Sequence, residues 1–170
     1  STQDISVEIA GNYQYATVKY ITDNGQNGER LTAHTVNKRD LNILEKTYKS
    51  GEEDWIELDK VLSRIKLKPG VYQVSAQATG YAMSYSKLTL YNVTSGKELV
   101  NGLNHYDPAY MTVMSLSGIF EIDKEGDLEL HQYTYGSRNE GGGLDIGPNV
   151  QNYNGEELYT QIEIMRLTKP

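Results

Sequence analysis

Few side chains in this sequence could carry metal or covalent chemistry, and their spacing fits no familiar catalytic motif. His34, His105 and His131 are scattered and lack the close ligand pairs that zinc sites use. The chain has no cysteine, which excludes a thiolate nucleophile, a thiolate metal ligand and a disulfide. It also has no Gly-x-Ser-x-Gly elbow and no phosphate-binding glycine loop. We therefore expect no enzymatic activity, no metal site and no cofactor.

The acidic residues predict a turn and argue against a nucleic-acid partner, and they give no clear sign of catalysis. Asp123–Asp127 lacks the alternating oxygen ligands of a calcium loop, so it predicts a tight hairpin in which Gly126 takes a positive φ. The 23 Asp and Glu residues leave a glycosidase pair open, although no two stand in a recognisable context. Against 16 Lys and Arg they give a net charge of −7, which repels a nucleic-acid backbone.

Two turn-rich segments carry the side chains best suited to binding a sugar or a protein surface. Residues 101–110 and 136–156 contain few apolar residues, and long loops in compact domains are often functional. Tyrosine rings stack on sugars, while amide and guanidinium groups form planar hydrogen bonds. The candidate receptor- or glycan-binding residues are Asn104, Tyr106, Tyr110, Arg138, Asn139, Asn149 and Tyr153. If these loops do not bind, the alternative is the surface around Tyr81 and Tyr85.

The aromatic composition favours a wet recognition surface. The chain has 14 Tyr against one Trp and one Phe. Tyrosine offers an apolar ring and a hydroxyl at low entropic cost, although it is also an ordinary strand residue. No segment reaches the roughly 20 consecutive apolar residues of a membrane-spanning helix. We expect no membrane insertion and no nucleic-acid partner.

Strands must position these loops, because apolar and polar residues alternate in short runs bounded by Gly, Pro, Asn or Asp. From Gly70 onward, one face carries Tyr72, Val74, Ala76 and Ala78, and the other carries Gln73, Ser75, Gln77 and Thr79. Leu128 and Leu130 oppose Glu129, His131, Tyr133 and Tyr135 in the same way. In the last run Leu158, Thr160, Ile162 and Ile164 oppose Tyr159, Gln161, Glu163 and Met165. One face of each strand is predicted to be core.

Two other segments are less regular. In Arg39–Tyr48, Leu41, Leu44 and Tyr48 have helical spacing, whereas the alternation of Leu41, Ile43 and Glu45 fits a strand equally well. Ser1–Tyr15 alternates only weakly, and it is either a leading strand or the end of a preceding shaft. Asn92–Gly96 predicts a turn that closes a hairpin.

The order of motifs from Lys68 to Leu130 resembles a known family. Pro69-Gly70-Val71-Tyr72, Leu90-Tyr91-Asn92-Val93-Thr94-Ser95-Gly96 and Gly118-Ile119-Phe120 resemble the jelly roll of tumour necrosis factor and of complement-type globular heads. The variant with Leu-Tyr-Asn-Val-Thr ends many bacteriophage tail fibres. The resemblance implies an all-β antiparallel sandwich, a strand in Arg39–Tyr48, an N-terminal strand segment over 1–30 and a jelly-roll domain over 31–170.

The resemblance also implies a homotrimer. The three strands above would lie in an inner sheet that packs around a threefold axis, and a polar face rich in Tyr and Gln suits a wet interface. The candidate interface residues are Gln73, Ser75, Gln77, His131, Tyr133, Tyr135, Tyr159 and Gln161. The alternative is a monomer whose second face meets solvent.

These expectations define a non-enzymatic function. The first hypothesis is a trimeric receptor-binding tip of a phage tail fibre, carried on the virion, that recognises a host cell-surface glycan or protein. The second hypothesis is a structural capsid or head-fibre module that decorates the particle and drives trimerisation. A third is a carbohydrate-binding domain of a bacterial surface protein.

Overall fold

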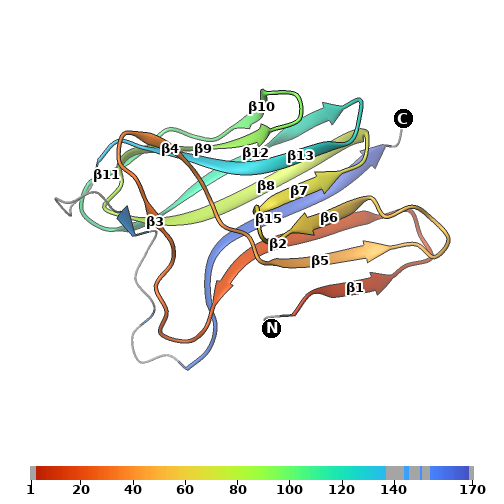
Figure 1. Cartoon of the computed structure of the whole chain (residues 1–170), viewed down its shortest axis with the longest axis horizontal. Coiled ribbons are helices and arrows are strands. Elements are labelled where there is room, and N and C mark those ends of the chain that lie inside the picture. The colour runs from red at the N-terminus through yellow and green to blue at the C-terminus, as the bar shows by residue number, and fades with distance from the viewer. Residues whose placement is uncertain (1–2, 137–143, 146–149, 151–153, 169–170) are drawn as a thin grey trace.

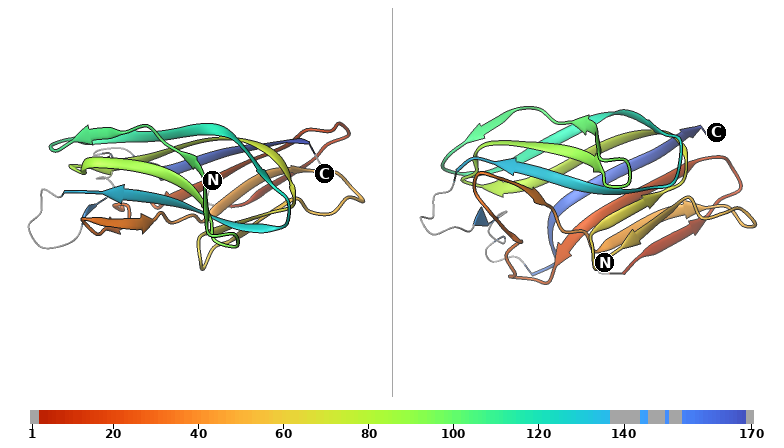
Figure 2. Two further views of the ribbon diagram at one scale, coloured as in Figure 1. Left: turned by 90° about the horizontal axis from the view of Figure 1, so that it is seen from above. Right: turned by 45° about the horizontal axis from the view of Figure 1, so that its top comes forward.

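The computed structural model describes residues 3–136, 144–145, 150 and 154–168, and every regular element in these ranges is a β-strand. Two sheets stack face to face as a sandwich (Figure 1, Figure 2). Alternating side chains leave one apolar face on each sheet, and the two apolar faces cover each other. The prediction of an all-β antiparallel sandwich is confirmed.

The first sheet has six strands, which are all antiparallel except for one parallel pair at the edge, β1 with β5. Its strands, in spatial order, are β1 (Ile5–Glu8), β5 (Ile43–Tyr48), β2 (Gln14–Thr22), β15 (Glu157–Thr168), β8 (Gly70–Tyr81) and β12 (Met111–Ile122). The strand in Arg39–Tyr48 is confirmed as β5.

The second sheet has seven strands. Its main path is β10 (Lys97–Asn101), β9 (Ser84–Asn92), β13 (Gly126–Thr134), β7 (Arg64–Leu67) and β6 (Ile56–Asp59). Two short strands join from the side: β11 (His105–Asp107) pairs with β9, and β4 (Thr35–Lys38) pairs with β13. A separate small pair joins β3 (Arg30–Leu31) to β14 (Leu144–Asp145).

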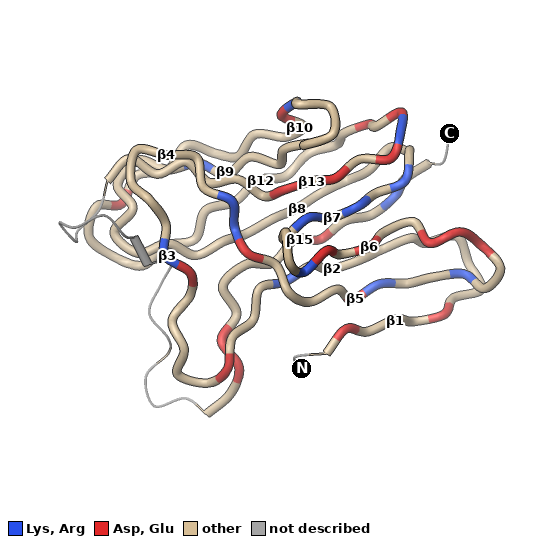
Figure 3. Tube along the Cα trace, in the orientation of Figure 1, with Lys and Arg blue, Asp and Glu red and all other residues tan. Residues whose placement is uncertain are grey.

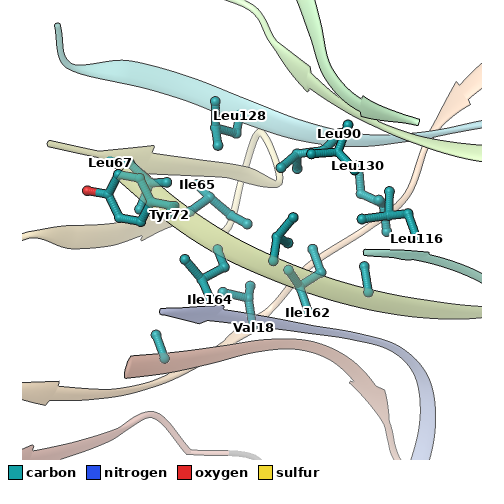
Figure 4. Close-up of a cluster of buried hydrophobic side chains, with 14 of the residues drawn as sticks. Val18, Ile65, Leu67, Tyr72, Leu90, Leu116, Leu128, Leu130, Ile162 and Ile164 are labelled. Atoms are coloured by element: carbon teal, nitrogen blue, oxygen red, sulfur yellow. The ribbon is translucent and has the colours of Figure 1, made fainter. Parts of the chain in front are cut away.

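The core lies between the sheets and follows the alternation of the strands. Ile162 and Ile164 from the six-stranded sheet and Leu90 and Leu128 from the other sheet are fully buried in one cluster (Figure 4). At one end the rings of Trp55, Tyr72 and Phe120 are stacked, with centroids 6.2 and 5.4 Å apart. The predicted core face of β8, with Tyr72, Val74, Ala76 and Ala78, is confirmed, as are Leu128 and Leu130 in β13.

A β-bulge corrects the predicted alternation at the start of β15. The register shifts between Leu158 and Thr160, so two residues of β15 follow each other on the inner side. Leu158, predicted to be core, is 47% exposed, whereas Tyr159, predicted at the interface, is only 3% exposed. Beyond the bulge, Ile162 and Ile164 are buried as predicted. A bulge has no signal in the alternation itself, because the pattern assumes an unbroken period of two.

The assignment of β13 to the same sheet as β8 and β15 is wrong. β13 pairs with β9, β7 and β4 in the seven-stranded sheet. His131, Tyr133 and Tyr135 therefore lie on the opposite side of the sandwich from Gln73, Ser75, Gln77 and Gln161. Strands of both sheets show one core face and one outer face, so alternation reveals which face is buried but not which sheet holds the strand.

Of the two turns predicted to close hairpins, one does so and the other crosses between the sheets. Asn92 Oδ1 accepts hydrogen bonds from the amides of Thr94 and Ser95, and Gly96 has a φ of +70°, which confirms the first turn. The hairpin predicted at Asp123–Asp127 is wrong, because this turn connects β12 of the six-stranded sheet to β13 of the seven-stranded sheet, and Gly126 does not have a positive φ. A Cβ at Gly126 would stand 3.1 Å from the amide atoms of Asn92, so close packing explains this glycine.

Candidate functional site

Three neighbouring strands bring polar and aromatic side chains together on the outer face of the seven-stranded sheet. In the registers, Tyr106 of β11 lies opposite Tyr85 of β9, and Lys87 of β9 lies opposite Tyr133 of β13. Residues at i and i+2 of a strand share a face, so Tyr85 and Lys87 point to the same side. The site is therefore built on paired strands, with a contribution from the loop before β11.

A tight connection between β8 and β9 sets the position of Tyr85. Ala82 and Ser84 have φ values of +54° and +58°, in the left-handed region that non-glycine residues rarely adopt. Between them Met83 is fully buried, and its backbone oxygen accepts a hydrogen bond of 2.8 Å from Thr134 Oγ1. This connection ties the start of β9 to the end of β13.

Local hydrogen bonds hold β11 in place. Asp107 Oδ1 accepts hydrogen bonds from the amides of Ala109, at 2.9 Å, and Tyr110, at 3.0 Å. These two backbone donors lower the pKa of Asp107 from its usual value of 3.8. His105 is held on the other side, where its Nε2 lies 2.9 Å from Thr112 Oγ1 of β12. The strand that presents Tyr106 is thus fixed at both ends.

The face between these strands is hollowed. The open hollow has a volume of about 480 Å³, and its lining residues come from β9, β13, β11 and the segment before β11. They are Tyr85, Ser86, Lys87, Asn104, His105, Tyr106 and Tyr133. We call this feature the aromatic hollow. Charged residues are sparse at this end of the sandwich and gather along β7 and β13 and in the loops of the opposite end (Figure 3).

The rings around the aromatic hollow form a connected and exposed cluster. The centroid of Tyr85 lies 4.6 Å from that of Tyr106 and 5.9 Å from that of Tyr135, whose ring meets His34 edge-on at 4.6 Å. Tyr85 and Tyr106 remain 59% and 57% exposed. Exposed rings that are held in place by one another are suited to stacking against the apolar face of a flat ligand.

The structure brings together only some of the residues that the sequence predicts as a binding site. Asn104 and Tyr106 line the aromatic hollow. Tyr110 is exposed at the turn after β11 and does not line it. Arg138, Asn139, Asn149 and Tyr153 lie outside the described residues.

Two further residues line the aromatic hollow: Lys87 was not among the predicted site residues, and Tyr133 was predicted to lie in the trimer interface. The available signal was the alternation of Tyr85 and Lys87 on one face of β9.

The residues predicted for the trimer interface are divided between two outer faces. Gln73, Ser75 and Gln77 are exposed on the six-stranded sheet, where Gln161 pairs with Gln77. This face also carries exposed apolar residues that the sequence analysis did not select. They are Met111, Val113, Ile119 and Leu158. The six-stranded face is therefore a mixed apolar and amide surface.

On the other face, His131 belongs to an ion-pair network. Glu129 accepts hydrogen bonds from Arg64 Nε at 2.9 Å and, through its other oxygen, from His131 Nε2 at 2.8 Å. The ring of Tyr91 stacks on His131, with centroids 4.7 Å apart. Burial alone would raise the pKa of Glu129, but the hydrogen bonds from His131 and Arg64 lower it. This network joins β7 to β13 and has an evident structural role.

Two other features, a metal site and a membrane-spanning helix, are absent from the described part of the chain. No group of three or more His, Cys, Asp or Glu side chains in it is arranged to hold a metal ion. Among the same residues, no helix is long and apolar enough to cross a membrane.

Comparison with known proteins supports the fold. No family model and no curated protein matches the sequence. Among solved structures, the chain is similar to the Eiger TNF of S. frugiperda, with a TM-score of 0.57 and 10% identity over 93% of this chain and 94% of that one.

Two further structures have the same architecture. Murine APRIL matches with a TM-score of 0.54 and 9% identity over 92% of this chain and 100% of that one. The globular domain of zebrafish complement 1qA protein matches with a TM-score of 0.50 and 12% identity over 94% of this chain and 100% of that one. The chain therefore has the jelly-roll fold of tumour necrosis factor ligands and complement globular heads.

Proposed function

We propose that this protein is a receptor-binding module that forms the homotrimeric tip of a bacteriophage tail fibre and recognises a glycan on the host cell surface. The tail-fibre assignment is supported by the segment Leu90–Gly96, which resembles the corresponding strand of many tail-fibre ends. The jelly-roll fold is consistent with that assignment.

The aromatic hollow is the observation that carries the binding proposal. Sugar sites combine aromatic faces, which cover the C–H face of the ring, with planar polar groups that bond the hydroxyls. The hollow supplies the rings of Tyr85, Tyr106 and Tyr133 and the amide of Asn104. A structural decoration module would have no need of exposed rings arranged in this way.

The outer face of the six-stranded sheet is the surface that we assign to the trimer interface. It combines exposed apolar residues such as Val113 and Ile119 with the amides of Gln73 and Gln77. Interfaces between copies of a chain use such apolar contacts together with water-bridged polar groups. Because the aromatic hollow lies on the other face, assembly leaves three hollows open, and three weak sites that engage one cell surface give high avidity.

A glycan array and a cell-adsorption assay test the proposal. We expect wild-type protein to bind a defined set of glycans and to adsorb to susceptible cells, and Tyr85→Ala/Tyr106→Ala to lose both activities. Tyr13→Ala is the matched control, because Tyr13 is 72% exposed and does not line the hollow. Thermal melting establishes that each variant is folded. Unchanged adsorption by the folded double variant would remove the hollow from the receptor site, and an array without specific hits would favour the structural module.

The hollow equally supports the carbohydrate-binding domain of a bacterial surface protein, since the same rings would serve it. Adsorption distinguishes the two assignments. A phage tip should adsorb only to cells of the susceptible host, whereas a bacterial carbohydrate-binding domain should follow its glycan wherever that glycan occurs.

A further inference from the structure

The charge of the aromatic hollow differs in sign from that of the whole chain. The chain has a net charge of −7, yet the residues that line the hollow include one lysine and no aspartate or glutamate. The acid on β11, Asp107, lies opposite Ser84 and does not line the hollow, and its Oδ1 is occupied by two backbone amides. A ligand in the hollow therefore meets a positive local charge.

Lys87 supplies that charge and has no carboxylate partner among the residues that the structure describes. Among the described residues no acid lies within 4.0 Å of its ammonium group, although other lysines form eight ion pairs with acids in this part of the chain. A half-buried lysine on a strand is ordinarily stabilised by an acid directly opposite it on the neighbouring strand. The residue opposite Lys87 is Tyr133. The ammonium group is thus available to a ligand.

Geometry places this cation beside the stacking surface. Lys87 lies two residues after Tyr85 on β9 and opposite Tyr133 on β13, and Cβ atoms of directly opposed residues are roughly 5 Å apart. A sugar ring stacked on these tyrosines would therefore carry its substituents within reach of the Lys87 ammonium group. Asn104 adds an uncharged donor and acceptor at the edge of the hollow.

We propose that the aromatic hollow selects an anionic saccharide, in which a sugar stacks on the tyrosines and presents its carboxylate or sulfate to Lys87. A hydrogen bond between an ammonium group and an anion is stronger than one between neutral groups. A single cation in an acidic protein matches a single negative charge, whereas a nucleic-acid polyanion would be repelled by the rest of the surface. This inference depends on the sugar site that is proposed above.

The test compares neutral and anionic trisaccharides that are all built on the galactose ring. Binding of tri-galactose, tri-galacturonate and 6-sulfated tri-galactose to the wild-type chain is measured by calorimetry or by NMR titration. We expect at least one anionic sugar to bind about tenfold tighter than tri-galactose. The relative affinity of galacturonate and of the sulfated sugar shows which anion is preferred. Raising the salt concentration should weaken only the anionic binding.

Variants at Lys87 test whether this residue is the cause. Lys87→Gln should abolish the preference for anionic over neutral sugars, while Lys87→Arg should keep most of that preference. Lys97→Gln is the control, because Lys97 is an exposed lysine of β10 outside the hollow. Melting curves check that the variants fold.

The outcomes separate this inference from the proposed function. Equal wild-type affinity for neutral and anionic sugars, or an undiminished preference in folded Lys87→Gln, would overturn the role of Lys87 and leave the sugar site standing. Failure of every sugar to bind would overturn both.

Discussion

Arg39 is a buried residue whose hydrogen bonds connect the two sheets. Its side chain is fully buried, and Nη1 donates hydrogen bonds to the backbone oxygen of Thr79 in β8 and to Gln132 Oε1 in β13. Its Nε lies 3.5 Å from Glu29 Oε2. Burial raises the pKa of Glu29 and lowers that of Arg39, because both charged forms lose contact with water. Each charge compensates for the burial of the other, so removal of one partner leaves the other charge buried and uncompensated.

Removal of Arg39 alone should therefore be severe. We expect Arg39→Met to lower the free energy of unfolding by about 3–5 kcal/mol, because the carboxylate of Glu29 is left buried without its partner. The double variant Arg39→Met/Glu29→Gln removes both charges and keeps an acceptor for the Asp40 amide, which now bonds Glu29 Oε2. Urea unfolding should show the double variant to be more stable than the single one. A double variant that is less stable would contradict this account of the pair.

Glu129 gives a prediction for the dependence of stability on pH. Its folded pKa lies below the ordinary value of 4.5, so its ionised form stabilises the fold at pH values above 4.5. That contribution is lost as the pH falls through the lowered folded pKa. Urea unfolding between pH 7 and pH 3 should show Glu129→Gln less stable than wild type at pH 7, with the gap closing toward pH 3. A constant gap would show that the carboxylate charge is not the cause.

At the scale of elements, the loop that carries Asn104 depends on a close approach of two backbones. A Cβ on Gly102 would stand 2.6 Å from the oxygen of Ser115 in β12 and 2.9 Å from that of Leu88 in β9. Backbone atoms of paired strands move little, so a larger residue must displace the loop. Gly102 thus fixes where the chain leaves β10 and enters the rim of the aromatic hollow.

Gly102→Ala should consequently affect both stability and binding. We expect a loss of about 1–3 kcal/mol in the free energy of unfolding, in the range of overpacked sites, and weaker sugar binding because Asn104 shifts. Gly11→Ala is the control, since a Cβ on Gly11 meets nothing within 4 Å. Denaturant unfolding and glycan titration measure the two effects. Full stability of Gly102→Ala would contradict the close approach.

The strands also differ in how well the sequence predicts their arrangement. The buried and exposed residues of β8 follow directly from alternation, since each side chain lies on one of two faces. The assignment of β13 failed because a core face looks alike in either sheet, and Leu158 and Tyr159 were exchanged by a bulge. In the aromatic hollow, Tyr106 was predicted from its loop. The alternation of β9 could place Lys87 beside Tyr85, but only the pairing of β9 with β13 places it beside Tyr133.

At the scale of the whole molecule, the two outer faces of the sandwich have different compositions and different proposed tasks. The six-stranded face presents exposed apolar side chains such as Val113 beside glutamine amides, whereas the seven-stranded face presents tyrosines and the aromatic hollow. Because the faces point away from each other, a contact through one leaves the other accessible. Tyr133, assigned to the interface from the sequence, lies on the face that we expect to remain open.

The solution mass of two matched variants tests this division between the faces most directly. By light scattering, wild-type protein and Tyr133→Lys should both have a mass of three chains of 19.1 kDa, whereas Val113→Lys should dissociate because its charge would be desolvated in the interface. Both positions are partly exposed in the single chain, so each variant should fold. A monomeric wild type, or a trimer that Tyr133→Lys breaks and Val113→Lys does not, would contradict the account.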